Sequence, residues 1–194
     1  MHVFIVYAHP SPDSFTREAR DSFIRGLTDA KHSYLLSDLY TMNFRSDMSE
    51  AEYRREADYQ THLPVADDVR AEQEKILACE GIVFIYPVFW TEAPSKLVGW
   101  FNRVWTYGFA YGDRTMPTLR KALCLCSAGH SLEHLETHGH LQSMRTVMLG
   151  DRIFDRAEHK ELVLLPHTAK FDLQAREAHR DKNLQTAYEL GRTF

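Results

Sequence analysis

The sequence predicts an α/β protein built on a five-stranded parallel sheet of strand order 2-1-3-4-5, with helices on both faces. Two observations lead to this fold class. Apolar runs of strand length alternate along the chain with stretches of helical periodicity. The clearest run, residues 82–86, lies between Gly81 and Pro87 and holds only β-branched and aromatic residues, as expected of a central strand covered on both faces. A chain of 194 residues suits one core, so we expect a single domain over residues 1–194.

Each element of this fold has its own pattern. Strands are expected where apolar residues follow one another, at residues 3–8, 33–36, 82–86, 121–126 and 161–165. Helices are expected where apolar residues recur at every third or fourth position, at residues 15–27, 67–78, 95–105, 132–149 and 172–190. The polar stretch 45–65 has weak periodicity, and we interpret it as a long loop.

Composition and charge exclude several classes of protein. With 44% hydrophobic residues, 26% charged residues and a net charge of -4, the chain lacks the basic stripe of a nucleic-acid-binding protein. Its apolar runs are too short for membrane insertion, and no targeting segment is found, so we expect a cytoplasmic protein. The cysteines Cys79, Cys124 and Cys126 are expected to be reduced and buried.

The strand order predicts where a ligand binds. In a 2-1-3-4-5 sheet the crevice lies outside the carboxyl ends of strands 1, 3 and 4, which selects the loops 9–16, 87–93 and 127–134. In the first loop, the hydroxyls of Ser11, Ser14 and Thr16 lie beside a helix N-terminus, an arrangement that suits a phosphate.

A structural role for the same loop is equally open. Ser14 or Asp13 can cap the helix, with Glu18 completing a capping box. The second loop carries a bulky apolar lip of Val88, Phe89 and Trp90 that suits a flat aromatic ligand. Neither a Walker A nor a G-x-G-x-x-G motif occurs, which argues against a nucleotide kinase and a Rossmann dinucleotide site.

Five segments in order carry a resemblance to a known family. They are YAHP-x-x-x-SF at 7–15, DLYTMNF at 38–44, YPVFWTEAPSKLVGWFNRV at 86–104, GFAYG at 108–112 and ALCLCSAG at 122–129. With them, the chain resembles the flavodoxin-like NAD(P)H:quinone oxidoreductases, a family that includes bacterial flavin reductases and ancillary oxidoreductases of potassium-efflux systems. The resemblance implies a flavodoxin-like three-layer sandwich that binds a flavin.

The resemblance also implies which residues bind the flavin. His9, Ser14, Phe15 and Thr16 match the loop at the flavin phosphate and ribityl chain, although Asn often replaces Thr at the last position. Pro87, Val88, Phe89, Trp90 and Thr91 match the loop along the isoalloxazine, where backbone N–H groups reach its N5 and O4 region. Ser127, Ala128, Gly129 and His130 match the wall at the pyrimidine end, where His130 replaces a glycine. Phe109 and Tyr111 match an aromatic segment that lines the partner's substrate pocket in the family's dimers.

The function implied is a two-electron transfer of hydride from NAD(P)H through the bound flavin to a quinone or similar small electron-poor aromatic, by ping-pong kinetics. FMN is favoured as the cofactor, with FAD possible, because the chain ends at Phe194 without the extension of longer relatives. We expect a homodimer, since the helix that carries Trp100, Phe101 and Trp105, together with the aromatic segment 106–111 after it, holds more apolar surface than one sheet face covers. Arg103 on that helix is expected to form a structural ion pair.

The alternative function is a flavin-binding regulatory subunit of a membrane transporter.

The histidine-rich segment 130–140 departs from the family pattern. Related quinone reductases carry a Tyr and a His in this loop that balance charge on the reduced flavin, and His134 and His138 are the candidate catalytic replacements. Histidines at 130, 134 and 138 share a helix face and suit zinc in principle, but without Cys or placed carboxylates we expect no metal.

Overall fold

The computed structural model describes residues 1–194 and contains one five-stranded parallel sheet of order β2-β1-β3-β4-β5. The predicted fold class and strand order are therefore confirmed. The strands are β1 (His2–Tyr7), β2 (Ser33–Asp38), β3 (Gly81–Pro87), β4 (Leu119–Ser127) and β5 (Ala157–Leu165). β3 is buried along its whole length, as its unbroken apolar run predicts.

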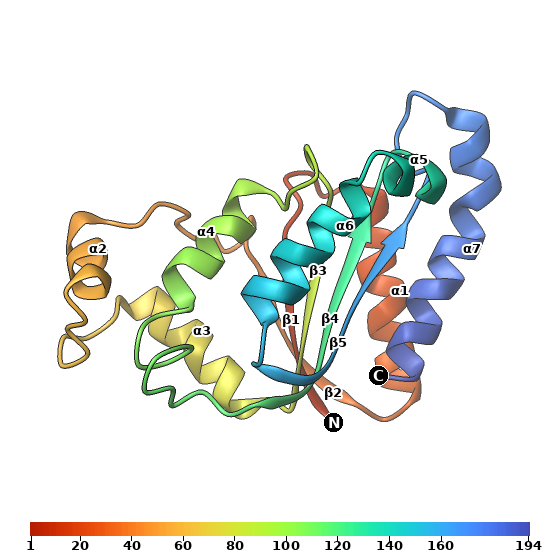
Figure 1. The fold of residues 1–194 in the computed structure, drawn as a ribbon. Helices are drawn as coiled ribbons and strands as arrows, with labels where there is room; N and C mark the ends of the chain where they lie inside the picture. The colour runs from red at the N-terminus through yellow and green to blue at the C-terminus, as the bar shows by residue number, and fades with distance from the viewer.

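Helices cover both faces of this sheet. They are α1 (Phe15–Asp29), α2 (Glu50–Ala57), α3 (Asp67–Ala78), α4 (Ser95–Val104), α5 (Leu132–Thr137), α6 (His140–Arg145), the π-helix η1 (Thr146–Ile153) and α7 (Leu173–Arg192). Figure 1 shows α1 and α7 side by side on one face and α3, α4 and α6 on the other. Alternate residues of β1 serve the two cores: Phe4 packs with the α3 and α4 side, and Ile5 with the α1 and α7 side.

The predicted loop at 45–65 is wrong, because α2 lies within it. Ser49 caps this helix, and it forms a capping box with Glu52. The helix escaped prediction because it has no apolar stripe. It is held to the protein by charge instead, since Arg103 of α4 donates to Glu52 at 2.6 and 2.9 Å.

The predicted helix at 132–149 is present but interrupted. Gly139 adopts a positive φ of 72°, which ends α5 and begins α6. Beyond α6 the chain continues as the π-helix η1, which carries Arg152 towards α4. The change from α-helical to π-helical geometry alters the direction of the segment without an intervening loop.

The aromatic helix α4 faces inward. Trp100 and Phe101 are buried against the sheet, and the Trp100 indole N–H donates to the fully buried Glu72 at 2.8 Å. Trp100 and Phe101 are therefore covered within the chain, whereas Tyr111 in the aromatic segment after α4 is 40% exposed, and the homodimer stays a prediction. The structural ion pair expected of Arg103 is confirmed. No helix combines the length and the apolar character needed to cross a membrane.

Candidate functional site

A cavity of about 410 Å³ lies outside the carboxyl ends of β1, β3, β4 and β5. We call it the first cavity. The sheet order places it here, because the loops that follow neighbouring parallel strands meet at one edge. Its walls come from four loops and the start of two helices, and the lining residues are His9, Ser11, Asp13, Ser14, Phe15, Thr16, Pro87, Val88, Phe89, Ser127, Gly129, Thr168, Ala169, Lys170 and Arg176.

The N-terminus of α1 forms the polar end of the first cavity. Ser14 is the N-cap, and its hydroxyl accepts a hydrogen bond from the backbone N–H of Arg17 at 3.2 Å. The capping box considered for Glu18 is absent, because the N3 position is Arg17, and Glu18 one residue further pairs with Arg180 of α7. The backbone N–H groups of Phe15 and Thr16 donate to no atom of the chain, so they remain available to an anion.

The hydroxyls of this loop are largely engaged within the protein. The Thr16 hydroxyl lies 2.7 Å from the Ser127 hydroxyl, and both residues are buried. This contact ties the start of α1 to the end of β4 across the floor of the first cavity. The backbone N–H groups, more than the three hydroxyls, therefore supply this end of the cavity with hydrogen-bond donors.

Two cations at this end were missed by the sequence analysis. Lys170 and Arg176 follow β5 and line the first cavity, and neither forms an ion pair. They were missed because only the ends of strands 1, 3 and 4 were considered. The loop after β5 reaches the cavity because Thr168 donates twice to the Ala128 carbonyl, from its N–H and its hydroxyl, at 3.0 Å each.

The loop after β3 forms the apolar wall, and it ends in a strained turn. Phe89 and Glu92 exchange backbone hydrogen bonds of 2.8 and 2.9 Å, with Trp90 and Thr91 at φ of 52° and 67° between them. Positive φ at both central residues defines a type I′ turn, which normally takes Asn and Gly. A β-branched threonine in this conformation is an outlier, and such strain occurs most often at functional sites.

Unpaired backbone donors lie along both loops that flank the first cavity. The N–H groups of Trp90 and Thr91 in one loop and of Gly129 and His130 in the other bond to no atom of the chain. By contrast, the Val88 N–H is engaged with the Ser127 carbonyl at 2.8 Å. An aromatic heterocycle in the cavity would find donors near both ends of its ring system.

Several predicted site residues lie outside the lining of the first cavity. Trp90, Thr91, Ala128 and His130 are adjacent in sequence to lining residues but are not part of the lining, and the Trp90 side chain is 99% exposed. Phe109 is 8% exposed, and the Tyr111 hydroxyl donates to Glu56 at 3.1 Å, away from this site. The role predicted for Phe109 and Tyr111 is to line the substrate pocket of a partner subunit, so it concerns a dimer and not the first cavity of the same chain.

His134 and His138 also lie outside the lining, in a row of imidazoles along α5 and the residues that flank it. Ring centroids are 4.2 Å apart for His130 and His134 and again 4.2 Å for His134 and His138, and His140 closes the group. The row starts at His130, next to the lining residue Gly129. Partial burial and the neighbouring imidazoles lower the pKa of His134, so this ring is neutral at pH 7. The rings stack rather than converge, and no group of three or more His, Cys, Asp or Glu side chains is placed to hold a metal.

Comparisons with known proteins agree with this geometry. A family model described as flavodoxin-like fold matches residues 1–154. The solved structure of an NAD(P)H:quinone oxidoreductase from Methanothermobacter marburgensis is 44% identical, with a TM-score of 0.93 over 100% of this chain and 96% of that one. Ribosyldihydronicotinamide dehydrogenase (quinone) from Rattus norvegicus is 33% identical over 123 residues, which are 56% of this chain and 53% of the relative.

A more distant solved structure carries a flavin. General stress protein 14 from Treponema denticola, in complex with FMN, has a TM-score of 0.65 at 22% identity, over 98% of this chain and 99% of that one, and this likeness shows the fold alone. The chain spans about half the length of the curated quinone dehydrogenases that it matches. Fold and matches together define the class: the chain belongs to the flavodoxin-like family that includes the NAD(P)H:quinone oxidoreductases.

Proposed function

We propose that this protein binds FMN in the first cavity and transfers two electrons from NAD(P)H to a quinone or a similar small electron-poor aromatic. The observation that carries the proposal is the set of unpaired backbone N–H groups around the cavity, at Phe15 and Thr16 on one end and along the loops of Trp90 and Gly129. The likeness to the Methanothermobacter enzyme at 44% identity supports the same activity.

The lining residues fit this cofactor. The Phe15 and Thr16 N–H groups, with Lys170 and Arg176 beside them, would hold the phosphate. Val88 and Phe89 would contact the face of the flat ring system. FMN is preferred over FAD because a cavity of about 410 Å³ is filled without the adenosine monophosphate half of FAD.

The flavin would supply the hydride chemistry, and the protein would supply binding, orientation and hydrogen-bond donors. The N–H groups of Trp90 and Thr91 would meet one edge of the ring, and those of Gly129 and His130 the pyrimidine end. They would stabilise negative charge without changing protonation state. Because Val88 and Phe89 would cover one ring face, NAD(P)H and the acceptor would alternate at the other face, as in ping-pong kinetics. Each turnover would take a hydride from NAD(P)H and one proton from solvent, and the quinone would gain these two electrons and two protons to become the hydroquinone.

The absorbance spectrum of the purified protein tests the cofactor, and the Ser14→Asp variant tests its position. Asp is as good an N-cap as Ser, so α1 should persist. The new carboxylate would lie beside the phosphate, and we expect FMN affinity to fall by about tenfold or more through like-charge repulsion. Ser49→Asp, at the N-cap of α2, is the matched control and should bind FMN as the wild type does. Equal affinity in Ser14→Asp and wild type would remove the phosphate from this loop.

Turnover and assembly need separate measurements. Steady-state oxidation of NAD(P)H with a quinone should give parallel double-reciprocal lines, as ping-pong kinetics require. A protein that binds FMN but oxidises no NAD(P)H would be a binding module of the same fold.

We further propose a homodimer in which Phe109 and Tyr111 line the partner's pocket. Sedimentation at low concentration tests it, and a fully active monomer would contradict it.

A further inference from the structure

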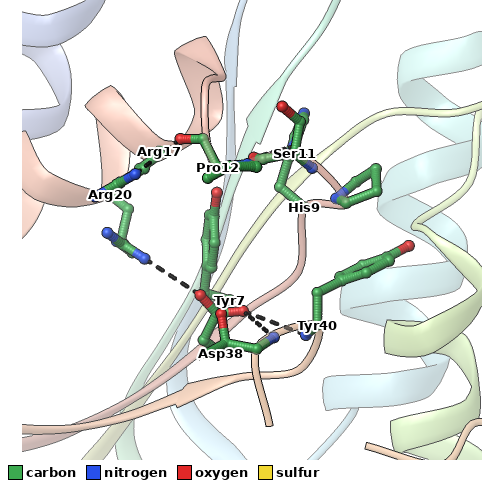
Figure 2. Close-up of a pocket in the computed structure, with 10 residues that line it drawn as sticks. Tyr7, His9, Ser11, Pro12, Arg17, Arg20, Asp38 and Tyr40 are labelled. Carbon is green, nitrogen blue, oxygen red and sulfur yellow. Dashed lines mark hydrogen bonds and ion pairs between the residues drawn. The ribbon is translucent and has the colours of Figure 1, made fainter. Parts of the chain in front are cut away.

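A second cavity, of about 560 Å³, lies at the carboxyl ends of β1 and β2, and the flavin proposal leaves it unused. Its polar lining is drawn in Figure 2 and includes Tyr7, His9, Arg17, Arg20, Asp38 and Tyr40. His9 and Ser11 line both cavities. A ligand that extends from the first cavity across this loop therefore reaches the second.

Two arginines of α1 line the second cavity, and they differ in how far they are engaged. Arg20 is committed to the protein: it bonds Asp21 at 2.7 Å, faces Asp38 at 3.6 Å and stacks on the Tyr7 ring at 4.6 Å. Arg17 is half-exposed and donates from Nη1 to the Pro12 carbonyl at 3.0 Å, while Asp21 is 3.9 Å away. The Nη2 donors of Arg17 are thus free for an anion at the rim.

His9 adds a neutral donor to the same wall. Its Nδ1 lies 3.0 Å from both the backbone N and the carbonyl O of Ser11, so this nitrogen is satisfied within the loop. Nε2 makes no hydrogen bond in the chain. Burial lowers the pKa of His9, so at neutral pH the ring approaches a ligand without charge.

The floor of the second cavity suits a ribose. Asp38, at the end of β2, accepts the backbone N–H groups of Tyr40 and Thr41 through Oδ1 at 3.2 and 3.1 Å. Its Oδ2 faces Arg20 and keeps a lone pair for a hydroxyl. Figure 2 shows the Tyr40 ring on the opposite side of Tyr7 from Arg20, and the Tyr40 hydroxyl has no partner in the chain.

In a ribose that carries a 2′-phosphate only the 3′-hydroxyl is free, and the open lone pair of Asp38 can accept it, while Arg17 on the same lining offers its free donors to the phosphate. We propose that the second cavity binds the adenosine 2′-phosphate half of a nucleotide, and that the nucleotide is NADPH. Arg17 binds the phosphate, Asp38 the ribose and Tyr40 the base. The choice of NADPH rests on the proposed function, whereas the phosphorylated ribose rests on the cavity alone.

Calorimetric titration of the FMN-saturated protein with adenosine 2′,5′-bisphosphate tests the second cavity directly. We expect binding that Arg17→Gln weakens about tenfold, since one charge-assisted contact is lost. Arg17→Lys should retain part of the affinity, because it keeps the charge without the fork. Arg54→Gln, at an exposed arginine of α2, is the control and should leave binding unchanged.

Kinetics then identify the source of the phosphorylated ribose. If the ligand is NADPH, Arg17→Gln raises KM for NADPH about tenfold and leaves KM for NADH unchanged. Unchanged KM for both, with weakened bisphosphate binding, assigns the cavity to a free nucleotide and overturns the NADPH part. No binding at millimolar bisphosphate, or equal affinity in wild type and Arg17→Gln, overturns the site. A protein that binds the bisphosphate but oxidises neither dinucleotide refutes the proposed function and leaves the cavity assignment standing.

Discussion

Arg152 of the π-helix η1 donates two hydrogen bonds to the carboxylate of Glu92, at 2.8 and 3.2 Å. Glu92 closes the strained turn that carries Trp90, and its carboxylate also accepts the Ala93 N–H at 2.7 Å. The guanidinium in turn lies over the Phe101 ring at 5.0 Å. A segment 60 residues away in the sequence thus fixes the turn beside the first cavity.

Arg152→Met tests this clamp. We expect the turn to loosen and FMN affinity to fall about fivefold, because a two-point ion pair of this partial exposure contributes about 1 kcal/mol. Flavin fluorescence titration measures the effect. Arg145→Met, at an exposed arginine of α6, should bind FMN normally. Wild-type affinity in Arg152→Met would show that the turn holds its shape without the clamp.

Relief of the strain in the same turn should raise the stability of the protein and lower its affinity for FMN. Thr91→Gly removes a β-branched residue from positive φ and should stabilise the protein by about 1 kcal/mol. For a chain of this size, that raises Tm by about 2–4 °C. The more mobile turn should bind FMN more weakly, since its free N–H groups are held less firmly. Thr186→Gly in the middle of α7 is the control and should lower Tm. A fall in Tm for Thr91→Gly would mean that the turn is unstrained.

The ion pairs of Arg103 predict how the free energy of unfolding depends on pH. Arg103 is buried and bonds Asp68 at 2.6 and 2.8 Å as well as Glu52, so Arg103→Met should cost about 3 kcal/mol by leaving Asp68 without a cation and Glu52 with Arg45 alone. The hydrogen bonds from Arg103 lower the pKa of Asp68. Urea unfolding measures the loss, with the exposed Arg145→Met as control.

The sign of the pH effect follows from this lowered pKa. Because the folded pKa of Asp68 lies below the unfolded value of about 3.9, the contribution is fully present above that value and disappears as the pH falls through the folded pKa. The difference in unfolding free energy between wild type and Arg103→Met should therefore shrink below about pH 4. A constant difference from pH 7 to pH 3 would show that packing, not charge, makes the contribution.

The row of histidines along α5 and its flanking residues predicts that substitutions nearer the first cavity slow flavin reduction more. His134 stacks on His130 at the rim of the first cavity, whereas His138 lies one ring further away. We expect His134→Ala to slow flavin reduction by NAD(P)H by less than about tenfold, because His134 acts through its stacking on His130 and not by a direct contact, and His138→Ala to slow it less still. Stopped-flow absorbance measures both rates, and His62→Ala, at an exposed histidine before α3, is the control. Equal rates in all variants would leave backbone N–H groups as the stabilisers.

Local pattern alone was sufficient for the sheet. Each strand contains an apolar run that marks its position, and α/β alternation leaves few arrangements for five such strands, although β5 begins four residues before its run, with exposed polar residues at 158–160. The same order selected the loops at the ends of β1, β3 and β4, and these loops contain most lining residues of the first cavity, from His9 to Gly129.

Tertiary structure decided the rest, because the forces involved act between segments that are distant in sequence. α2 has no apolar periodicity and exists where Arg103 meets Glu52. Lys170 and Arg176 reach the first cavity because Thr168 is bonded to the loop after β4. The positive φ of Thr91 is maintained by a hairpin that Arg152 secures from another layer. Charge pairing and backbone strain of this kind leave no periodic trace in a sequence, whereas burial of apolar surface does.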